Sequence, residues 1–199
     1  MQPGTGPARW FRMAVMKTRP LFVLAFALLI PSAPALATVL PESCGKDEIK
    51  FDIKVKMPAE GQATPDIPAP AAGKAQIVFI ETLNSASFSF TTPTTRFGMD
   101  GEWVGANKGD SHFAIDVTPG EHNVCVNWQS DAPDEANKVG MDTFTAEAGK
   151  IYYYEVKVIR LPGSRELDFL FDLKQLGGIE GRYRAKVSGV SASKVRKTT

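Results

Sequence analysis

The sequence predicts an all-β fold, a single β-sandwich of roughly eight or nine short antiparallel strands, immunoglobulin-like or prealbumin-like in kind. Short stretches in which apolar and polar residues alternate recur along the chain, with turn residues about every eight to twelve positions. The 17 Gly and 14 Pro residues are spread over the 199 positions, which favours many turns over long helices. A hydrophobic fraction of 43% and a charged fraction of 23% are typical of a globular chain, and the length suits one domain.

A leader precedes the predicted fold. Residues 1–37 contain basic but no acidic residues, then the apolar run Leu21–Ile30, then small residues at Ala35 and Ala37. This order is typical of a secretory signal peptide, whereas a membrane-spanning helix needs about 20 apolar residues. We therefore expect residues 1–37 to be removed and the protein to be exported, to the periplasm or cell envelope of a bacterium. An uncleaved anchor is the alternative, and the true start codon stays open.

Two cysteines, Cys44 and Cys125, follow the leader. Exported domains use paired cysteines as disulfides, so we expect a Cys44–Cys125 bond, worth about 4 kcal/mol for a loop of this length. Lipidation of Cys44 is disfavoured because Glu42 stands close before it. The thiols and the two histidines lack metal-ligand spacing, so no metal and no other cofactor is expected.

The first strand and the linker come next. Residues 38–56 include one strand, in which Ile49, Phe51, Ile53 and Val55 alternate with charged residues. Residues 57–73 are rich in Pro, Ala and Gly, and are expected to form an extended linker that tethers this strand at a distance.

Residues 74–190 are assigned to the sandwich. Ala75–Glu81 is a dense apolar strand, and Asp100-Gly101 is a strong hairpin signal. Pro119-Gly120 and Gly149 are expected to turn the chain between neighbouring strands, the second turn forming a hairpin. No segment predicts a long helix; one helical turn is expected at most, around residues 171–176.

The charge is uneven along the chain. Residues 191–199 are expected to form a flexible basic tail, and six basic residues and no acid follow Gly181: Arg182, Arg184, Lys186, Lys194, Arg196 and Lys197. The rest of the exported chain is acidic, so nucleic acid is not an expected partner. The tail is interpreted as solvated, with peripheral contact to anionic lipid or polymer as the alternative.

One stretch carries a family resemblance. Residues 99–126 read MDGEWVGANKGDSHFAIDVTPGEHNVCV, preceded by GKAQIVFIE and followed by AEAGKIYYYEVKV. Over residues 73–181 the chain resembles an uncharacterised family of bacterial envelope proteins, the domain of unknown function 2846. The resemblance implies a β-sandwich in an exported protein and implies no activity.

The conspicuous residues of this stretch suit a structural motif: Asp100, Gly101, Pro119, Gly120 and His122. The two glycines fit turn positions that need positive φ, and His122 is expected to bond a neighbouring carbonyl or carboxylate. A role for His122 as a ligand or as an acid or base is the alternative. Four aromatic residues are candidates for an exposed binding surface: Trp103, Trp128, Tyr152 and Tyr154.

No catalytic signature is present: the chain contains no G-x-S-x-G, H-E-x-x-H, P-loop or dinucleotide-binding motif. We therefore expect a non-catalytic envelope module that binds a partner protein, a polymer or another envelope component. The alternative is a hydrolase or metal-dependent enzyme built on scattered carboxylates with His122.

Overall fold

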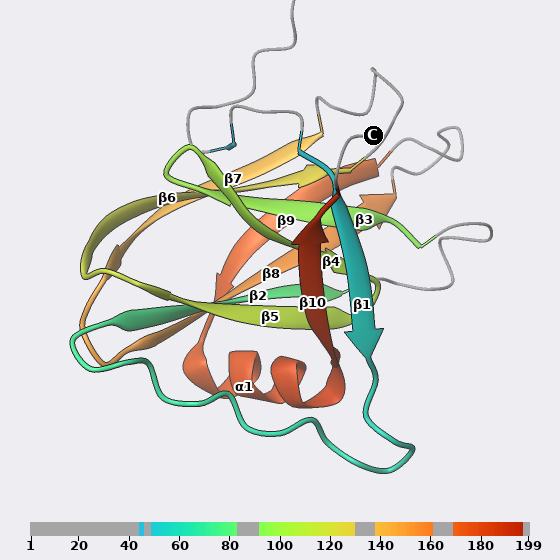
Figure 1. The fold of residues 1–199 in the computed structure, drawn as a ribbon, viewed down its shortest axis with the longest axis horizontal. Helices are drawn as coiled ribbons and strands as arrows, with labels where there is room; N and C mark the ends of the chain where they lie inside the picture. The colour runs from blue at the N-terminus through green and yellow to red at the C-terminus, as the bar shows by residue number, and fades with distance from the viewer. Residues whose placement is uncertain (1–43, 46–48, 83–91, 130–137, 161–168, 197–199) are drawn as a thin grey trace, which may run out of the picture. The chain divides into compact units, whose positions relative to one another are not determined.

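Ten strands and one helix form a two-sheet sandwich in the computed structural model, which describes residues 44–45, 49–82, 92–129, 138–160 and 169–196 (Figure 1). One sheet has the order β1-β10-β5-β2-β8-β9 and the other the order β4-β3-β6-β7. The all-β sandwich predicted from the sequence is confirmed. The strands are β1 (Phe51–Lys56), β2 (Ala75–Thr82), β3 (Thr94–Met99), β4 (Glu102–Lys108), β5 (Ser111–Val117), β6 (Gly120–Trp128), β7 (Val139–Ala146), β8 (Ile151–Arg160), β9 (Phe169–Leu176) and β10 (Gly189–Val195), and the helix is α1 (Gly178–Val187).

The main core lies between the two sheets. Ile77 and Phe79 of β2 face Phe97 of β3 and Val126 of β6, and all four side chains are completely buried. The ring centroids of Phe79 and Phe97 are 4.7 Å apart. Alternation in each strand sends every second side chain into this layer, which is the pattern that the sequence displays.

A tight hairpin joins β3 and β4 in the four-stranded sheet. Its two central residues, Asp100 and Gly101, have φ of 52° and 87°. Both values are positive, as a two-residue hairpin turn requires, and Asp and Gly are among the residues that tolerate them best. The hairpin expected at this pair is confirmed.

Strand pairing differs from the expectation in three ways. The turn at Pro119-Gly120 leads from β5 in one sheet to β6 in the other, and the turn at Gly149 likewise leads from β7 to β8. The pairs β2–β8 and β10–β5 are parallel, so the large sheet is mixed. A short turn looks the same in sequence whether the chain folds back beside itself or crosses to the facing sheet.

The end segments also differ from the expectation. Residues 191–195, expected in a flexible tail, belong to β10, which pairs antiparallel with β1. The N-terminal strand is therefore part of the sandwich and not a tethered extension. Residues 171–176 lie in β9, and the helix follows them. Strand β10 thus takes up residues 191–195 of the expected tail, and the helix lies within the range 74–190 that was assigned to strands alone.

Residues 1–37, which the sequence predicts to be a leader, lie outside the described residues. Within the described ranges, the helix is too short and too polar to cross a bilayer.

Candidate functional site

His122 and Asp100 lock the β3–β4 hairpin onto β6. Nδ1 of His122 lies 2.6 Å from Oδ2 of Asp100, and Nε2 lies 2.8 Å from the carbonyl oxygen of Thr118. Both partners accept, so the ring satisfies both bonds when it is doubly protonated. Burial lowers the pKa of His122, but the Thr118 carbonyl and the Asp100 carboxylate outweigh it, and the pKa is raised above 6.5. The Asn123 amide donates to the other oxygen of Asp100 at 2.9 Å, so this motif is a structural clasp.

His112 ties β5 to the end of the helix. Its Nδ1 lies 2.8 Å from Oγ of Ser188, whose hydroxyl donates to the Ala185 carbonyl. Burial lowers the pKa of His112. Across the described residues, no three His, Cys, Asp or Glu side chains are grouped so that they could hold a metal ion.

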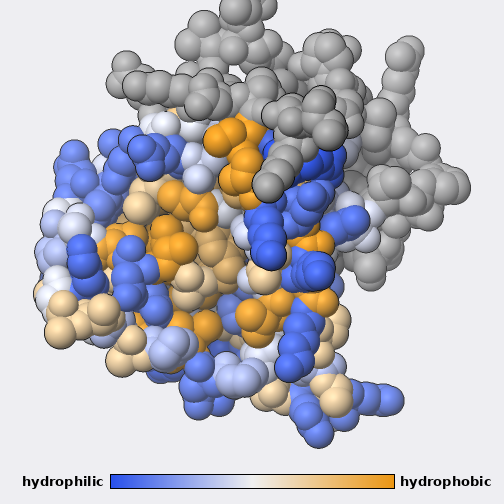
Figure 2. Space-filling view, viewed as in Figure 1, coloured by the Kyte–Doolittle hydropathy of each residue, from blue (hydrophilic) through white to orange (hydrophobic). Residues whose placement is uncertain are grey.

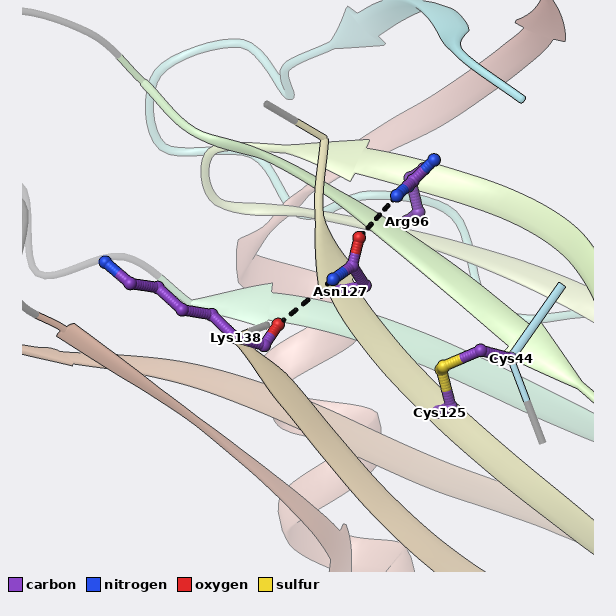
Figure 3. The surroundings of a disulfide bond; sticks show 5 residues. All are labelled: Cys44, Arg96, Cys125, Asn127 and Lys138. Atoms are coloured by element: carbon purple, nitrogen blue, oxygen red, sulfur yellow. Dashed lines mark hydrogen bonds between the residues drawn. A yellow bond between two sulfur atoms is a disulfide. The ribbon is translucent and has the colours of Figure 1, made fainter. Parts of the chain in front are cut away.

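The Cys44–Cys125 disulfide is present and confirms the predicted pairing, with a Cα–Cα distance of 5.3 Å (Figure 3). It attaches the chain before β1 to the four-stranded sheet. Beside it, Arg96 donates to the side-chain oxygen of Asn127 at 2.5 Å, and Asn127 donates to the Lys138 carbonyl at 3.3 Å. Arg96 also donates to the Ile49 carbonyl at 2.9 Å, so this buried guanidinium holds the segment before β1 against the four-stranded sheet. Arg96 was not identified from the sequence.

The four candidate aromatic residues do not share a surface. Tyr154 is completely buried between the sheets, and its hydroxyl donates to Asp142 at 3.1 Å. Tyr152 and Trp128 are half-buried against the same core. The Trp103 ring instead stacks under the Arg96 guanidinium, 4.4 Å from its centroid. The aromatic surface expected from the sequence is therefore not assembled, because Tyr152, Tyr154 and Trp128 pack against the core between the sheets and Trp103 packs against Arg96.

Glu81, at the end of β2, is a buried acid. Its carboxylate accepts from the Thr95 hydroxyl at 2.5 Å and from the Gly109 amide at 3.1 Å. Loss of hydration by complete burial, which these hydrogen bonds only partly offset, raises its pKa to about 8. Glu81 is therefore largely protonated at neutral pH and acts as a polar link inside the sandwich.

Helix α1 packs on the outer face of the six-stranded sheet through small residues. Gly181 and Ala185 are buried, and a Cβ built on Gly181 would lie 2.1 Å from the Tyr153 ring. A salt bridge of 3.6 Å joins Arg184 to Glu155, which is completely buried on β8. The absence of a side chain at Gly181 therefore lets the helix backbone lie directly on the sheet.

The opposite side of α1 presents large apolar side chains to solvent. Ile179, Tyr183 and Val187 are 81%, 62% and 52% exposed. Their spacing of four residues puts them in one row along the helix. A surface helix ordinarily buries its large apolar residues, whereas α1 buries only Gly181 and Ala185 and exposes its large apolar residues together with its charged ones. Among the described residues, this exposed apolar row is the strongest indication of a site that binds another molecule.

Two further exposed apolar residues lie where β1 ends and β10 begins, at Met57 and Val190. A Cβ on Gly189, two residues after the helix ends, would meet the Met57 sulfur at 2.6 Å, so Met57 lies next to this end of α1. We call Ile179, Tyr183, Val187, Met57 and Val190 the α1 face. Figure 2 shows apolar side chains around the lower ends of β1 and β10, bordered by hydrophilic ones.

The linker is bound to the sandwich along its length and runs beside α1 to β2 (Figure 1). Thr64 is buried, and its amide and hydroxyl donate to the carbonyls of Lys186 and Ala185 at 3.0 and 2.7 Å. These bonds satisfy carbonyls at the helix C-terminus that have no partner within the helix. Asp66 adds a salt bridge of 2.9 Å to Lys186.

A groove of about 880 Å³ lies between the linker and the β1–β10 pair. Lys54 and Lys56 of β1 line it together with Ala192 and Val190, their partners in register on β10, and linker residues 57–65 complete it. The groove is lined mainly by apolar groups and by two lysines. It therefore resembles the α1 face, where apolar side chains also lie next to basic ones.

Comparison with known proteins adds no relative: no protein-family model and no curated protein sequence matches this chain.

Proposed function

We propose that the protein is a non-catalytic exported module that binds another component of the cell envelope through the α1 face. The observation that carries this proposal is the reversed helix, which buries Gly181 and Ala185 and exposes Ile179, Tyr183 and Val187. Exposed apolar rows cost solubility, and in a monomeric protein they commonly mark an interaction site.

Export is supported by the disulfide, because such bonds persist in oxidising compartments. Together with the leader that the sequence predicts, it favours the periplasm or cell envelope. Membership of the family resembled in residues 73–181 stays a proposal, and the hairpin at Asp100-Gly101 supports it.

A binding module also fits the state of the histidines better than a hydrolase does. Both ring nitrogens of His122 are engaged with Asp100 and Thr118, and His112 is buried against Ser188. A general base needs a ring nitrogen that can reach the substrate proton.

Site-specific photocrosslinking tests the proposal. The photoreactive residue p-benzoylphenylalanine is placed at Tyr183, and a matched protein carries it at Met141, which is 56% exposed on β7 in the other sheet. In cells that export the chain, we expect a discrete adduct, protein or lipid, from position 183 and not from position 141. Equal labelling from both positions, or none from position 183, would refute the assignment of the α1 face.

A further inference from the structure

We infer that the α1 face docks on an anionic lipid bilayer, with the helix lying in the plane of the membrane surface. The inference rests on the proposed function and names the partner of the same surface. Helix α1 rests on the sheet through Gly181 and Ala185 and presents an apolar row with basic residues beside it to the outside, so this row is the part of the helix that can enter a headgroup layer.

The apolar row has the geometry for shallow insertion. Ile179 and Val187 stand two turns apart with Tyr183 between them, so the row spans most of a helix about 15 Å long. All three side chains point away from the sheet, because the positions that face it are Gly181 and Ala185. Tyr suits the headgroup level, since it has an apolar ring and a polar tip. A flat bilayer can therefore meet the whole row at once.

The cations next to the row lie among acidic residues, so the attraction to an anionic surface depends on the wider basic surface and not on the helix alone. Arg182 and Lys186 flank it on one side, and Arg184 flanks it on the other beside Glu180. Lys186 and Arg184 are held by Asp66, Glu155 and Glu180, which fixes their positions and partly neutralises them.

Further cations extend this surface beyond the helix. Lys54 and Lys56 line the adjoining groove, and Lys194 is exposed farther along β10. Basic residues near an anionic leaflet each add to membrane affinity, and the acidic remainder of the exported chain disfavours approach by other faces. The charge distribution therefore orients the protein with α1 toward the membrane.

A bilayer fits the size of the surface better than a second copy of the chain does. The helix row alone, about 15 Å long and about 10 Å wide, offers on the order of 150 Å², so a stable protein dimer at about 800 Å² per partner would need much more surface than the row and the groove beside it. Lipid imposes no minimum interface area, because binding there grows with each inserted side chain and each cation.

Vesicle flotation tests the inference. The chain is purified without residues 1–37, the form expected after export. It is mixed with vesicles of phosphatidylcholine alone, or of phosphatidylcholine with about 30% phosphatidylglycerol, each at about 0.1 M and about 0.5 M salt. We expect binding to the anionic vesicles at the lower salt, about tenfold stronger than to the neutral ones, and weakening at the higher salt. Equal binding to both vesicle types, or binding to neither, would overturn the inference.

Matched variants locate the contact. The double variant Ile179→Ser, Tyr183→Ser should lose on the order of tenfold in vesicle binding, because two inserting side chains are removed. Met141→Ser removes an equally exposed apolar residue from the other sheet and should bind as the wild type does. Arg182→Ser should weaken binding to anionic vesicles and leave binding to neutral ones unchanged. The wild type and all variants are prepared with the same N-terminus, so that differences in binding come from the substitutions. A urea unfolding midpoint equal to that of the wild type shows that a variant is folded. A double variant that floats like the wild type would refute the site.

The crosslinking experiment separates this inference from the proposed function. A discrete protein adduct at position 183 without vesicle binding would overturn the lipid inference and leave the binding module standing. Neither an adduct nor vesicle binding would overturn both. Vesicle binding that the double variant loses supports both.

Discussion

Replacing Glu81 by Gln should remove a pH dependence of stability that this one buried acid causes. The Glu81 carboxyl group is completely buried and bonded to Thr95 and Gly109, and its pKa is raised from 4.5 to about 8. Between these two pH values the folded chain keeps a proton that the unfolded chain releases. Stability contributed by Glu81 is therefore fully present below pH 4.5 and is lost as the pH rises through about 8.

The size of the effect follows from the shift. Each pKa unit corresponds to about 1.4 kcal/mol, so the free energy of unfolding should fall by about 4 kcal/mol between pH 5 and pH 9 through Glu81 alone. Glutamine has nearly the same shape and no charge; its amide oxygen can accept from the Gly109 amide while its NH2 group donates to the hydroxyl oxygen of Thr95. The Glu81→Gln variant should therefore lack this contribution and become the more stable protein at alkaline pH.

Urea unfolding at pH 5, 7 and 9 measures the effect. The informative quantity is the difference between wild type and Glu81→Gln at each pH, because other titrating groups cancel in it. Glu121→Gln, an exposed acid on β6, is the matched control and should run parallel to the wild type. A difference between wild type and Glu81→Gln that stays constant within about 1 kcal/mol across this range would refute the reasoning.

Three further outcomes are expected. Reducing the disulfide, which links residues 81 positions apart, should lower the free energy of unfolding by about 4 kcal/mol in urea titrations, and an unchanged midpoint would contradict this. Gly181→Ala should destabilise by about 1–3 kcal/mol although Ala favours helices, because the new methyl group meets an aromatic ring at 2.1 Å; Gly178→Ala, with no atom nearer than 3.6 Å, should not. In NMR titrations the pKa of His122 should lie above 6.5 and should fall in Asp100→Asn, and a pKa unaffected by the substitution would show that the clasp is absent.

The fold class could be predicted because alternation and turn residues are local signals. The run of apolar residues around Ile77 and Phe79 is enough to predict a strand, and the Asp100-Gly101 pair is enough to predict a hairpin turn. Which strand pairs with which is a non-local property, so the parallel neighbours β2 and β8 could not be inferred from their sequences. The disulfide was predictable for a different reason: the exported chain contains two cysteines, which allow one pairing.

The helix and the candidate site were missed because α1 reverses the usual pattern. Ile179, Tyr183 and Val187 do recur every fourth residue, a signal of an amphipathic helix. That rule would have turned these residues toward the core, whereas Gly181 occupies the contact with the sheet. Two glycines within ten residues also lower the helix propensity. The helix is stabilised by tertiary contacts, among them the hydrogen bond from Thr64 to a carbonyl at the helix C-terminus. Such contacts join residues far apart in the chain, so they cannot be predicted from the residues of the helix alone.

The pairing of β1 with β10 affects when the fold can be completed. The two strands join through six residue pairs, and the ion pair between Asp52 and Arg196 closes a span of 144 residues. The first strand to be synthesised therefore has no sheet to join until the last strand has emerged. Forming such a distant contact is slow, because almost the whole chain must be ordered before the pairing is gained. The large sheet is therefore complete only when its C-terminal strand is available, so the two ends of the described fold are ordered together.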